Sequence, residues 1–206
     1  MSYSAFAQFA LGIAGNYNTS LGFDENWNFD TEKLKFKNET AHGFSVGLFL
    51  RAGKRLFVQS ELMYNFMISN ANTVTERKTN GVQATEINKS NIHQNTLTLP
   101  VLFGVKLVRT NFFNMRLMTG PRFRFNISSK YNAASGDVDI SATPRKWQLG
   151  FEAGLGFDLG RITIDGRYNL MQDIFSYNFS DTPLKFSPIN SFSVGIGVKF
   201  VDIKKK

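Results

Sequence analysis

Large apolar residues occupy every second position along much of this chain, and the clearest run begins at Trp147 and ends at Phe157. In that run, Trp147, Leu149, Phe151, Ala153, Leu155 and Phe157 alternate with Gln148, Gly150, Glu152, Gly154 and Gly156. Successive side chains of a β-strand point to opposite faces, so the run predicts a strand with one apolar face and one face of small or charged residues. The same period predicts eight strands in all, at residues 9–18, 43–51, 56–68, 96–107, 114–125, 147–157, 162–170 and 190–200.

The connections between these strands alternate strictly in length. Long segments at residues 19–42, 69–95, 126–146 and 171–189 alternate with short turns at residues 52–55, 109–113 and 158–161. In an up-and-down meander, every long segment then lies at one end of the sheet and every short turn at the other. Outer-membrane barrels have this asymmetry, with long extracellular loops and short periplasmic turns. The sequence therefore predicts an all-β fold, an eight-stranded antiparallel up-and-down transmembrane β-barrel in the outer membrane.

The apolar face could instead point inward, as in a soluble lipocalin-like barrel. The interior of an eight-stranded barrel has room only for its own side chains or one small ligand, and the apolar face carries too many Phe, Leu and Trp to fit there. The opposite face carries small residues that suit a crowded lumen: Gly47, Gly104, Gly120, Gly150, Gly154, Gly156, Gly195 and Gly197. We therefore expect the apolar face to contact lipid, where a closed barrel also pairs every backbone polar group.

Some residues break the alternation. Large apolar side chains on the predicted lumen face are Phe49, Phe57, Met63, Leu102 and Met118, and one polar residue, Thr119, falls on the lipid face. Pro100 and Pro121 cannot donate a hydrogen bond to a strand ladder. We expect β-bulges or strand ends close to these two prolines.

Composition narrows the class of protein further. The chain has 206 residues, which fits one all-β domain, and it has no Cys, which excludes disulfides, thiol catalysis and Cys-based zinc sites. The predicted domains are a barrel at residues 9–200 and a basic C-terminal tail at residues 201–206. Two interpretations of residues 1–8 stay open: a signal-peptide remnant, indicated by Ala5-Phe6-Ala7, or a lead-in to the first strand.

The net charge of +8 lies in the strands, turns and tail, because the four long segments together are close to neutral. A periplasmic basic rim is predicted at the lumen mouth, formed by Arg51, Lys106, Arg116 and Lys199. Attraction to acidic lipid head groups is the expected role of this charge. Membrane lipid, including lipopolysaccharide, is thus a predicted partner, whereas nucleic acid is not, because no continuous basic face with interleaved aromatic residues occurs.

Deeper on the lumen face, acidic and basic residues occur in equal number. The predicted lumen charge network consists of Glu61, Glu152 and Asp165 with Arg122, Arg124 and Arg167. Unpaired charges inside a narrow barrel would be costly, so we expect ion pairs that plug the lumen. The alternative is a narrow pore for ions or small solutes, gated by the same residues.

Several strand motifs resemble the PorT-like outer-membrane β-barrel family of Bacteroidota. They are Leu97-Thr98-Leu99-Pro100-Val101-Leu102-Phe103, Thr119-Gly120-Pro121, Gly150-Phe151-Glu152-Ala153-Gly154-Leu155-Gly156, Arg167-Tyr168-Asn169-Leu170 and Gly195-Ile196-Gly197-Val198-Lys199-Phe200. The resemblance extends from the fourth predicted strand to the C-terminus, with a weaker first third. It implies the fold and an outer-membrane location, and roles beside secretion or nutrient-uptake machinery.

Catalysis has little support in the sequence. A surface lipid or ester hydrolase would need a Ser-His pair near the outer rim, and only His42 and His93 are available, near Ser45 and Ser90. Isolated histidines at strand ends are more often surface residues than members of a dyad. The two histidines also lack the spacing of metal ligands. We therefore predict no enzyme activity, no cofactor and no metal site.

The second long segment predicts a hairpin. Alternating residues 73–78 and 82–87 flank Thr79-Asn80-Gly81, and Asn-Gly is the strongest short hairpin signal. The third long segment repeats this pattern more weakly around Ser135-Gly136. Strands that continue beyond the membrane have open edges on which a partner strand can pair, although solvated loops would fit the same residues. The predicted function is a binding, scaffold or accessory component that contacts an envelope protein through its extracellular loops.

Overall fold

The computed structural model describes residues 8–20, 23–28, 32–38, 40–79, 82–110, 112–133, 140–144, 146–171, 175–179, 182–184 and 189–203. Within these residues the elements are β1 (Phe9–Ser20), β2 (Phe23–Asn28), β3 (Glu32–Asn38), β4 (Ala41–Gly53), β5 (Leu56–Thr79), β6 (Val82–Arg109), β7 (Phe113–Ala133), β8 (Ile140–Pro144), β9 (Trp147–Leu159), β10 (Ile162–Met171), β11 (Phe175–Phe179), β12 (Thr182–Leu184) and β13 (Ile189–Ile203). No helix in the described part of the chain is long and apolar enough to cross a membrane.

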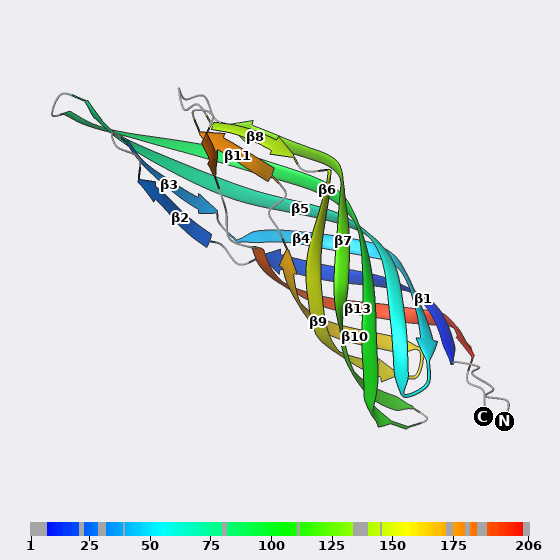
Figure 1. Cartoon of the computed structure of the whole chain (residues 1–206). Coiled ribbons are helices and arrows are strands. Elements are labelled where there is room, and N and C mark those ends of the chain that lie inside the picture. Colours follow the sequence, from blue (N-terminus) through cyan, green and yellow to red (C-terminus); the bar gives the residue numbers. More distant parts are fainter. Residues whose placement is uncertain are drawn as a thin grey trace.

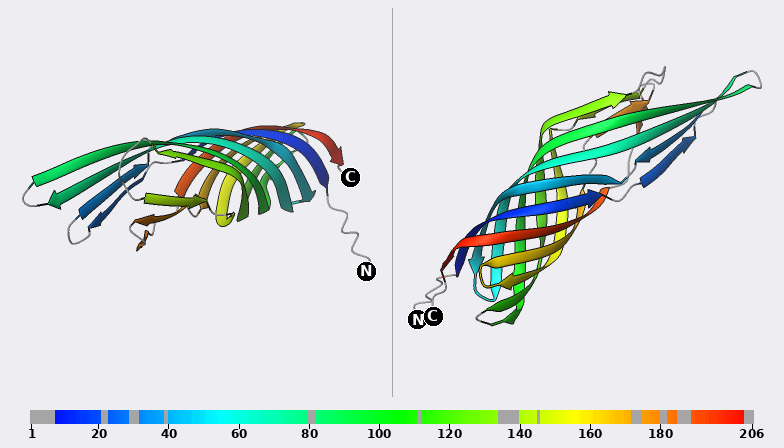
Figure 2. Two further views of the ribbon diagram at one scale, coloured as in Figure 1. Left: turned by 90° about the horizontal axis from the view of Figure 1, so that it is seen from above. Right: turned by 180° about the vertical axis from the view of Figure 1, so that it is seen from behind.

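Eight of these strands close into a barrel. Antiparallel pairing runs in the order β1, β4, β5, β6, β7, β9, β10 and β13, and β13 pairs back with β1. The strands are strongly tilted and wrap around a common axis (Figures 1 and 2). The predicted eight-stranded antiparallel barrel is therefore confirmed.

The two faces of the strands are distributed as the alternation predicts. On β9, Trp147 and Phe151 lie outside and are 65% and 52% exposed, whereas Gln148 and Glu152 lie inside and are 1% exposed. The same division holds for the other barrel strands, which places a band of exposed apolar side chains around the outside. Such a band is stable only against lipid. The lipid-facing interpretation is confirmed, and the soluble lipocalin-like alternative is wrong.

The long segments contain much more strand than the sequence predicts. Strands β5 and β6 stay paired from Leu56↔Val105 to Thr79↔Val82, far past the predicted ends at residues 68 and 96. The β2–β3 hairpin pairs along the extension of β5, and β8, β11 and β12 form a separate small sheet. Figure 1 shows the β5–β6 ribbon projecting from one end of the barrel. The Asn80-Gly81 turn and the Ser135-Gly136 signal lie outside the described residues.

The opposite end of the barrel, called the turn end here, has tight connections. Gly53 closes β4 with a φ of 133°, and Gly160 connects β9 to β10 with a φ of 59°. Residues with a side chain rarely adopt these conformations, so glycine is the residue that fits both turns. At the same end β13 continues to Ile203, past the predicted boundary at residue 200, and the terminal lysines lie outside the described residues.

The predicted bulges at the prolines are absent from the described strands. Pairing between β5 and β6 skips from Ser60↔Val101 to Met63↔Thr98, around Pro100, but the register on either side is the same. A proline removes a hydrogen-bond donor without inserting a residue, so the ladder loses bonds and keeps its register. Register shifts lie instead at Leu11/Gly12, Asn95/Thr96 and Lys106/Val108.

The five apolar residues that break the alternation do face the lumen. Together with Ala14 they form two buried clusters, one of Ala14, Phe49 and Met63 and one of Phe57, Leu102 and Met118. Glycines on neighbouring strands provide the space, because a Cβ on Gly12 would lie 2.4 Å from the Phe49 ring and a Cβ on Gly104 would lie 2.2 Å from the Phe57 ring. Thr119 faces outward, as predicted, and its hydroxyl donates to the Glu152 carbonyl oxygen at 3.1 Å.

Candidate functional site

A network of buried ion pairs crosses the middle of the lumen, and Arg167 on β10 lies at its centre. The Arg167 guanidinium donates to both carboxylate oxygens of Glu61, Nη1 to Oε2 at 2.8 Å and Nη2 to Oε1 at 2.6 Å. It also donates to Glu152 Oε1 at 2.8 Å and to Asp165 Oδ2 at 3.0 Å. One guanidinium therefore joins carboxylates from β5, β9 and its own strand, a geometry for which its planar fork of donors is suited.

Arg122 extends this network toward the ribbon end. Its Nη1 donates to Glu152 Oε2 at 2.9 Å and to Asn169 Oδ1 at 2.8 Å. Glu152 thus bridges two arginines, one through each carboxylate oxygen. The next inward-facing residue of β7 is Arg124, which lines a cavity of about 20 Å³ together with Arg122.

Arg116 extends the network toward the turn end. Its Nη2 donates to Asp165 Oδ1 at 2.6 Å and to the Thr163 hydroxyl, and it lies 3.3 Å from Asp158 Oδ1. Its Nη1 donates to Gln59 Oε1 at 3.2 Å. Because its side chain is fully buried, Arg116 belongs to the interior of the network and not to a rim at the lumen mouth.

Arg51 lies closer to the turn end and connects the charged and apolar sides of the lumen. Its Nη1 donates to Asp158 Oδ2 at 2.9 Å and its Nε to Gln59 Oε1 at 2.6 Å. Its guanidinium carbon lies 5.6 Å from the centre of the Phe49 ring and 5.5 Å from that of Phe57. Cation–π contacts of this kind stabilise a cation that has left bulk water.

Among the residues predicted for the lumen network, the structure joins Glu61, Arg122, Glu152, Asp165 and Arg167 into one set of ion pairs. Sequence reasoning missed Asp158, which it assigned to a turn, and the polar partners Gln59, Thr163 and Asn169. A signal for Asp158 was present, because it continues the inward-facing series of Glu152, Gly154 and Gly156 on β9.

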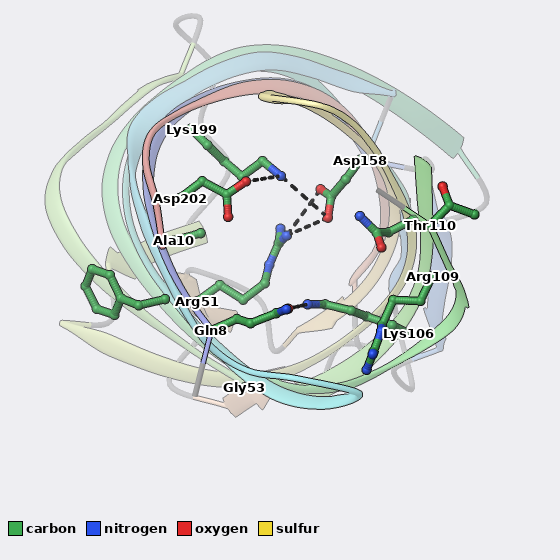
Figure 3. Close-up of a pocket in the computed structure, with 12 residues that line it drawn as sticks. Gln8, Ala10, Arg51, Gly53, Lys106, Arg109, Thr110, Asp158, Lys199 and Asp202 are labelled. Carbon is green, nitrogen blue, oxygen red and sulfur yellow. Dashed lines mark hydrogen bonds and ion pairs between the residues drawn. The ribbon is translucent and has the colours of Figure 1, made fainter. Parts of the chain in front are cut away.

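Three residues of the predicted basic rim line a cavity of about 190 Å³ at the turn end: Arg51, Lys106 and Lys199 (Figure 3). Lys106 Nζ donates to Gln8 Oε1 at 2.9 Å. Lys199 Nζ lies 3.9 Å from Asp158 and 3.5 Å from Asp202. All three basic side chains are buried and point into the lumen, so their charge lies at the mouth of the barrel and not on its lipid-facing surface.

The two histidines lie on the outer face near the ribbon end. His42 on β4 and His93 on β6 both pair with Ile68 of β5, and all three face outward. His42 Nδ1 lies 2.5 Å from the Tyr17 hydroxyl, and the two rings stack. Ser45 points into the lumen, where its Oγ accepts from Asn18 Nδ2 at 3.1 Å, so a His42–Ser45 dyad is wrong. The side chain of Ser90 lies outside the described residues.

Within the described residues, no group of three or more His, Asp or Glu side chains could hold a metal ion. The lumen presents fixed guanidinium, ammonium and carboxylate groups, which can bind charged groups.

A closed barrel with an exposed apolar band and a charged lumen defines an integral protein of the outer membrane. Residues 6–170 match the outer membrane protein β-barrel domain family, and the chain belongs to that family. No curated protein matches the sequence.

Solved structures of small barrels resemble this one. The outer membrane protein OprG from Pseudomonas aeruginosa superposes with a TM-score of 0.51 at 16% sequence identity, over 94% of this chain and 96% of that chain. Ail, the attachment invasion locus protein of Yersinia pestis, superposes with a TM-score of 0.41 at 14% identity, over 92% of this chain and 97% of that chain. The likeness to OprG supports the fold.

Proposed function

We propose that this protein is a binding, scaffold or accessory component of the outer membrane, which contacts an envelope protein through the sheet at its ribbon end. In this proposal the ribbon end is extracellular and the turn end is periplasmic, which is the orientation of barrels with short turns at one end. The protein performs no chemistry of its own. Membrane lipid, including lipopolysaccharide in the outer leaflet, surrounds the apolar band.

The observation that carries the proposal is the sheet that extends beyond the barrel. Strands β2, β3, β5 and β6 lie side by side there, and β2 pairs only with β3 among the described strands. An edge strand with unpaired N–H and C=O groups can pair with a strand of another protein. Two views show this sheet projecting well away from the barrel, where a partner would reach it (Figure 2).

Two further observations support the proposal. The Arg167 network occupies the middle of the lumen between the two cavities, which disfavours the alternative of a narrow pore. The resemblance of the strand motifs to PorT-like barrels favours a place beside secretion or nutrient-uptake machinery, although a shared fold does not determine function.

Native pull-down from outer membranes tests the proposal. The informative variant replaces residues 74–87 with Asn-Gly, so that Thr73 and Asn88, which already pair, flank a two-residue turn. It keeps the barrel strands and removes the ribbon tip together with much of the edge to which β3 pairs. A matched control replaces Lys54-Arg55, the turn between β4 and β5 at the opposite end, with the same Asn-Gly.

The expected result is a stoichiometric envelope protein that co-purifies with the wild type and the control but is lost from the ribbon variant. Folding of each variant is checked by the difference in electrophoretic mobility between unheated and heated samples. A partner retained by the ribbon variant would show that the ribbon is not the contact site. A wild type that purifies without any stoichiometric protein would contradict an accessory role.

A further inference from the structure

The cavity at the turn end carries more uncompensated positive charge than the ion-pair network in the interior of the lumen. In the interior network, Arg116, Arg122 and Arg167 are matched by Glu61, Glu152 and Asp165. The cavity is lined by four basic residues, Arg51, Lys106, Arg109 and Lys199, and by two carboxylates, Asp158 and Asp202. Asp158 also lies 3.3 Å from Arg116. Its negative charge is therefore shared with the interior network and only partly offsets the basic residues around the cavity.

Some of the basic groups around the cavity lack the partners that buried cations need. Arg51 is 4% exposed, and its buried Nη2 atom has no hydrogen-bond partner. Lys106 is 8% exposed, and the partner observed for its Nζ is the neutral amide of Gln8. A buried cationic donor without a hydrogen-bond partner is costly, more so than a neutral one. These donors therefore favour an anion that fills the cavity.

The geometry of the cavity suits a small oxyanion. Figure 3 looks into the turn end and shows the Arg51 guanidinium near the middle of the barrel, with Lys106 and Lys199 approaching from different sides. The volume of about 190 Å³ has room for one phosphate group and a few water molecules, since a water molecule in the liquid takes about 30 Å³. Guanidinium and ammonium groups are the usual protein partners of phosphate oxygens.

We propose that the turn-end cavity binds one phosphate-sized oxyanion through Arg51, Lys106 and Lys199. The oxyanion is either dissolved phosphate or the phosphate of a lipid head group, which offer the same oxygen atoms to the basic side chains. The site lies at the end of the barrel opposite the ribbon, and its existence does not depend on partner binding through the ribbon.

The test is a titration followed by NMR of the ¹⁵N-labelled full-length protein in maltoside micelles, which contain no phosphate. Inorganic phosphate is added, and the backbone amides of Arg51, Lys106 and Asn114, which lie along the cavity wall, are observed. Lys106→Gln removes one charge and keeps a side chain that can hydrogen-bond to Gln8. Lys54→Gln is the matched control, because it removes the same charge from an exposed turn residue at the same end.

The expected result is saturable shifts in these amides, with an affinity at least tenfold weaker in Lys106→Gln and within twofold of wild type in Lys54→Gln. Lys199→Gln should repeat the loss if Lys106→Gln fails to fold. Equal weakening by Lys106→Gln and Lys54→Gln would overturn the site, because it would show general charge attraction.

A second arm separates the two sources of phosphate. Short-chain phosphatidylglycerol is titrated into the same micelles, with a neutral diacylglycerol as its phosphate-free control. Saturation by inorganic phosphate supports a dissolved ligand. Saturation by phosphatidylglycerol alone, weakened by Lys106→Gln, supports a head group. If neither inorganic phosphate nor phosphatidylglycerol gives saturable shifts, the proposal is overturned.

Discussion

Arg167 and Glu61 reach toward each other from opposite walls of the barrel and form an ion pair through two hydrogen bonds of 2.8 and 2.6 Å. Their strands, β10 and β5, are separated by β13, β1 and β4 on one side and by β9, β7 and β6 on the other. The pair therefore spans the lumen at its full width. It joins the two walls and lies across the barrel axis.

Neutralising Glu61 should destabilise the barrel. Glu61→Gln keeps the side-chain shape but leaves the buried Arg167 with Glu152 and Asp165 as its carboxylate partners. Removing one partner of a buried ion pair typically lowers the free energy of unfolding by about 3–5 kcal/mol. Here the two remaining carboxylates reduce the loss. We expect the free energy of unfolding, measured by urea titration in lipid vesicles, to fall by about 2–3 kcal/mol.

Lys146→Gln is the control for this measurement, because it removes a charge from an exposed residue and should change the free energy of unfolding by less than about 0.5 kcal/mol. Equal stability of Glu61→Gln and wild type would show that the ion pair does not hold the lumen together.

Packing of the lumen glycines gives a second prediction. A Cβ on Gly104 would lie 2.2 Å from the buried Phe57 ring, so Gly104→Ala should cost about 1–3 kcal/mol in unfolding free energy through overpacking. Gly166→Ala is the matched control, since a Cβ there meets nothing within 4 Å. Replacing the Phe57 ring with the smaller leucine side chain, in the double variant Gly104→Ala/Phe57→Leu, should recover part of the lost stability. A Gly104→Ala protein as stable as Gly166→Ala would refute the tight packing.

The depth of the membrane can be mapped with arginine on the lipid face. Ile196 lies in the middle of β13 and faces outward, and Ile203 is the last residue of the same strand. Arginine near the bilayer midplane costs about 2–4 kcal/mol, against about 0–1 near the interface. Unfolding in vesicles should therefore show a larger loss of stability for Ile196→Arg than for Ile203→Arg. Similar losses at the two positions would argue against a membrane centred on Ile196.

The barrel strands could be predicted from the sequence because lipid imposes a strict alternation on them. Beyond the membrane that constraint ends, and the extensions of β5 and β6 and the hairpin of β2 and β3 show no strong apolar face. The only clear signal there is Asn80-Gly81, which predicted that the two strands continue as a ribbon. The extent of their pairing depends on contacts between segments far apart in sequence, which the alternation of residues does not encode.

The composition of the lumen network could be predicted, but its depth and partners could not. Alternation indicates that Arg116 points inward, yet its position along the axis depends on the tilt of the strands, and the structure places it within the network. The sequence prediction placed Asp158 in the turn at residues 158–161, whereas in the structure it belongs to β9 and pairs with Arg51 inside the lumen. The expectation of bulges at the prolines was wrong, because a proline in the sequence is compatible both with a bulge and with a ladder that skips hydrogen bonds and keeps its register.

Conductance across a planar lipid bilayer tests most directly the claim that this barrel is a binding component with a closed lumen. Purified wild-type protein is inserted into the bilayer, and a porin is inserted in parallel as the conducting control. Because the ion pairs around Arg167 span the lumen, the wild type should give no steady current above that of a protein-free bilayer. Steady single-channel currents from the wild type would contradict the closed lumen and favour the pore.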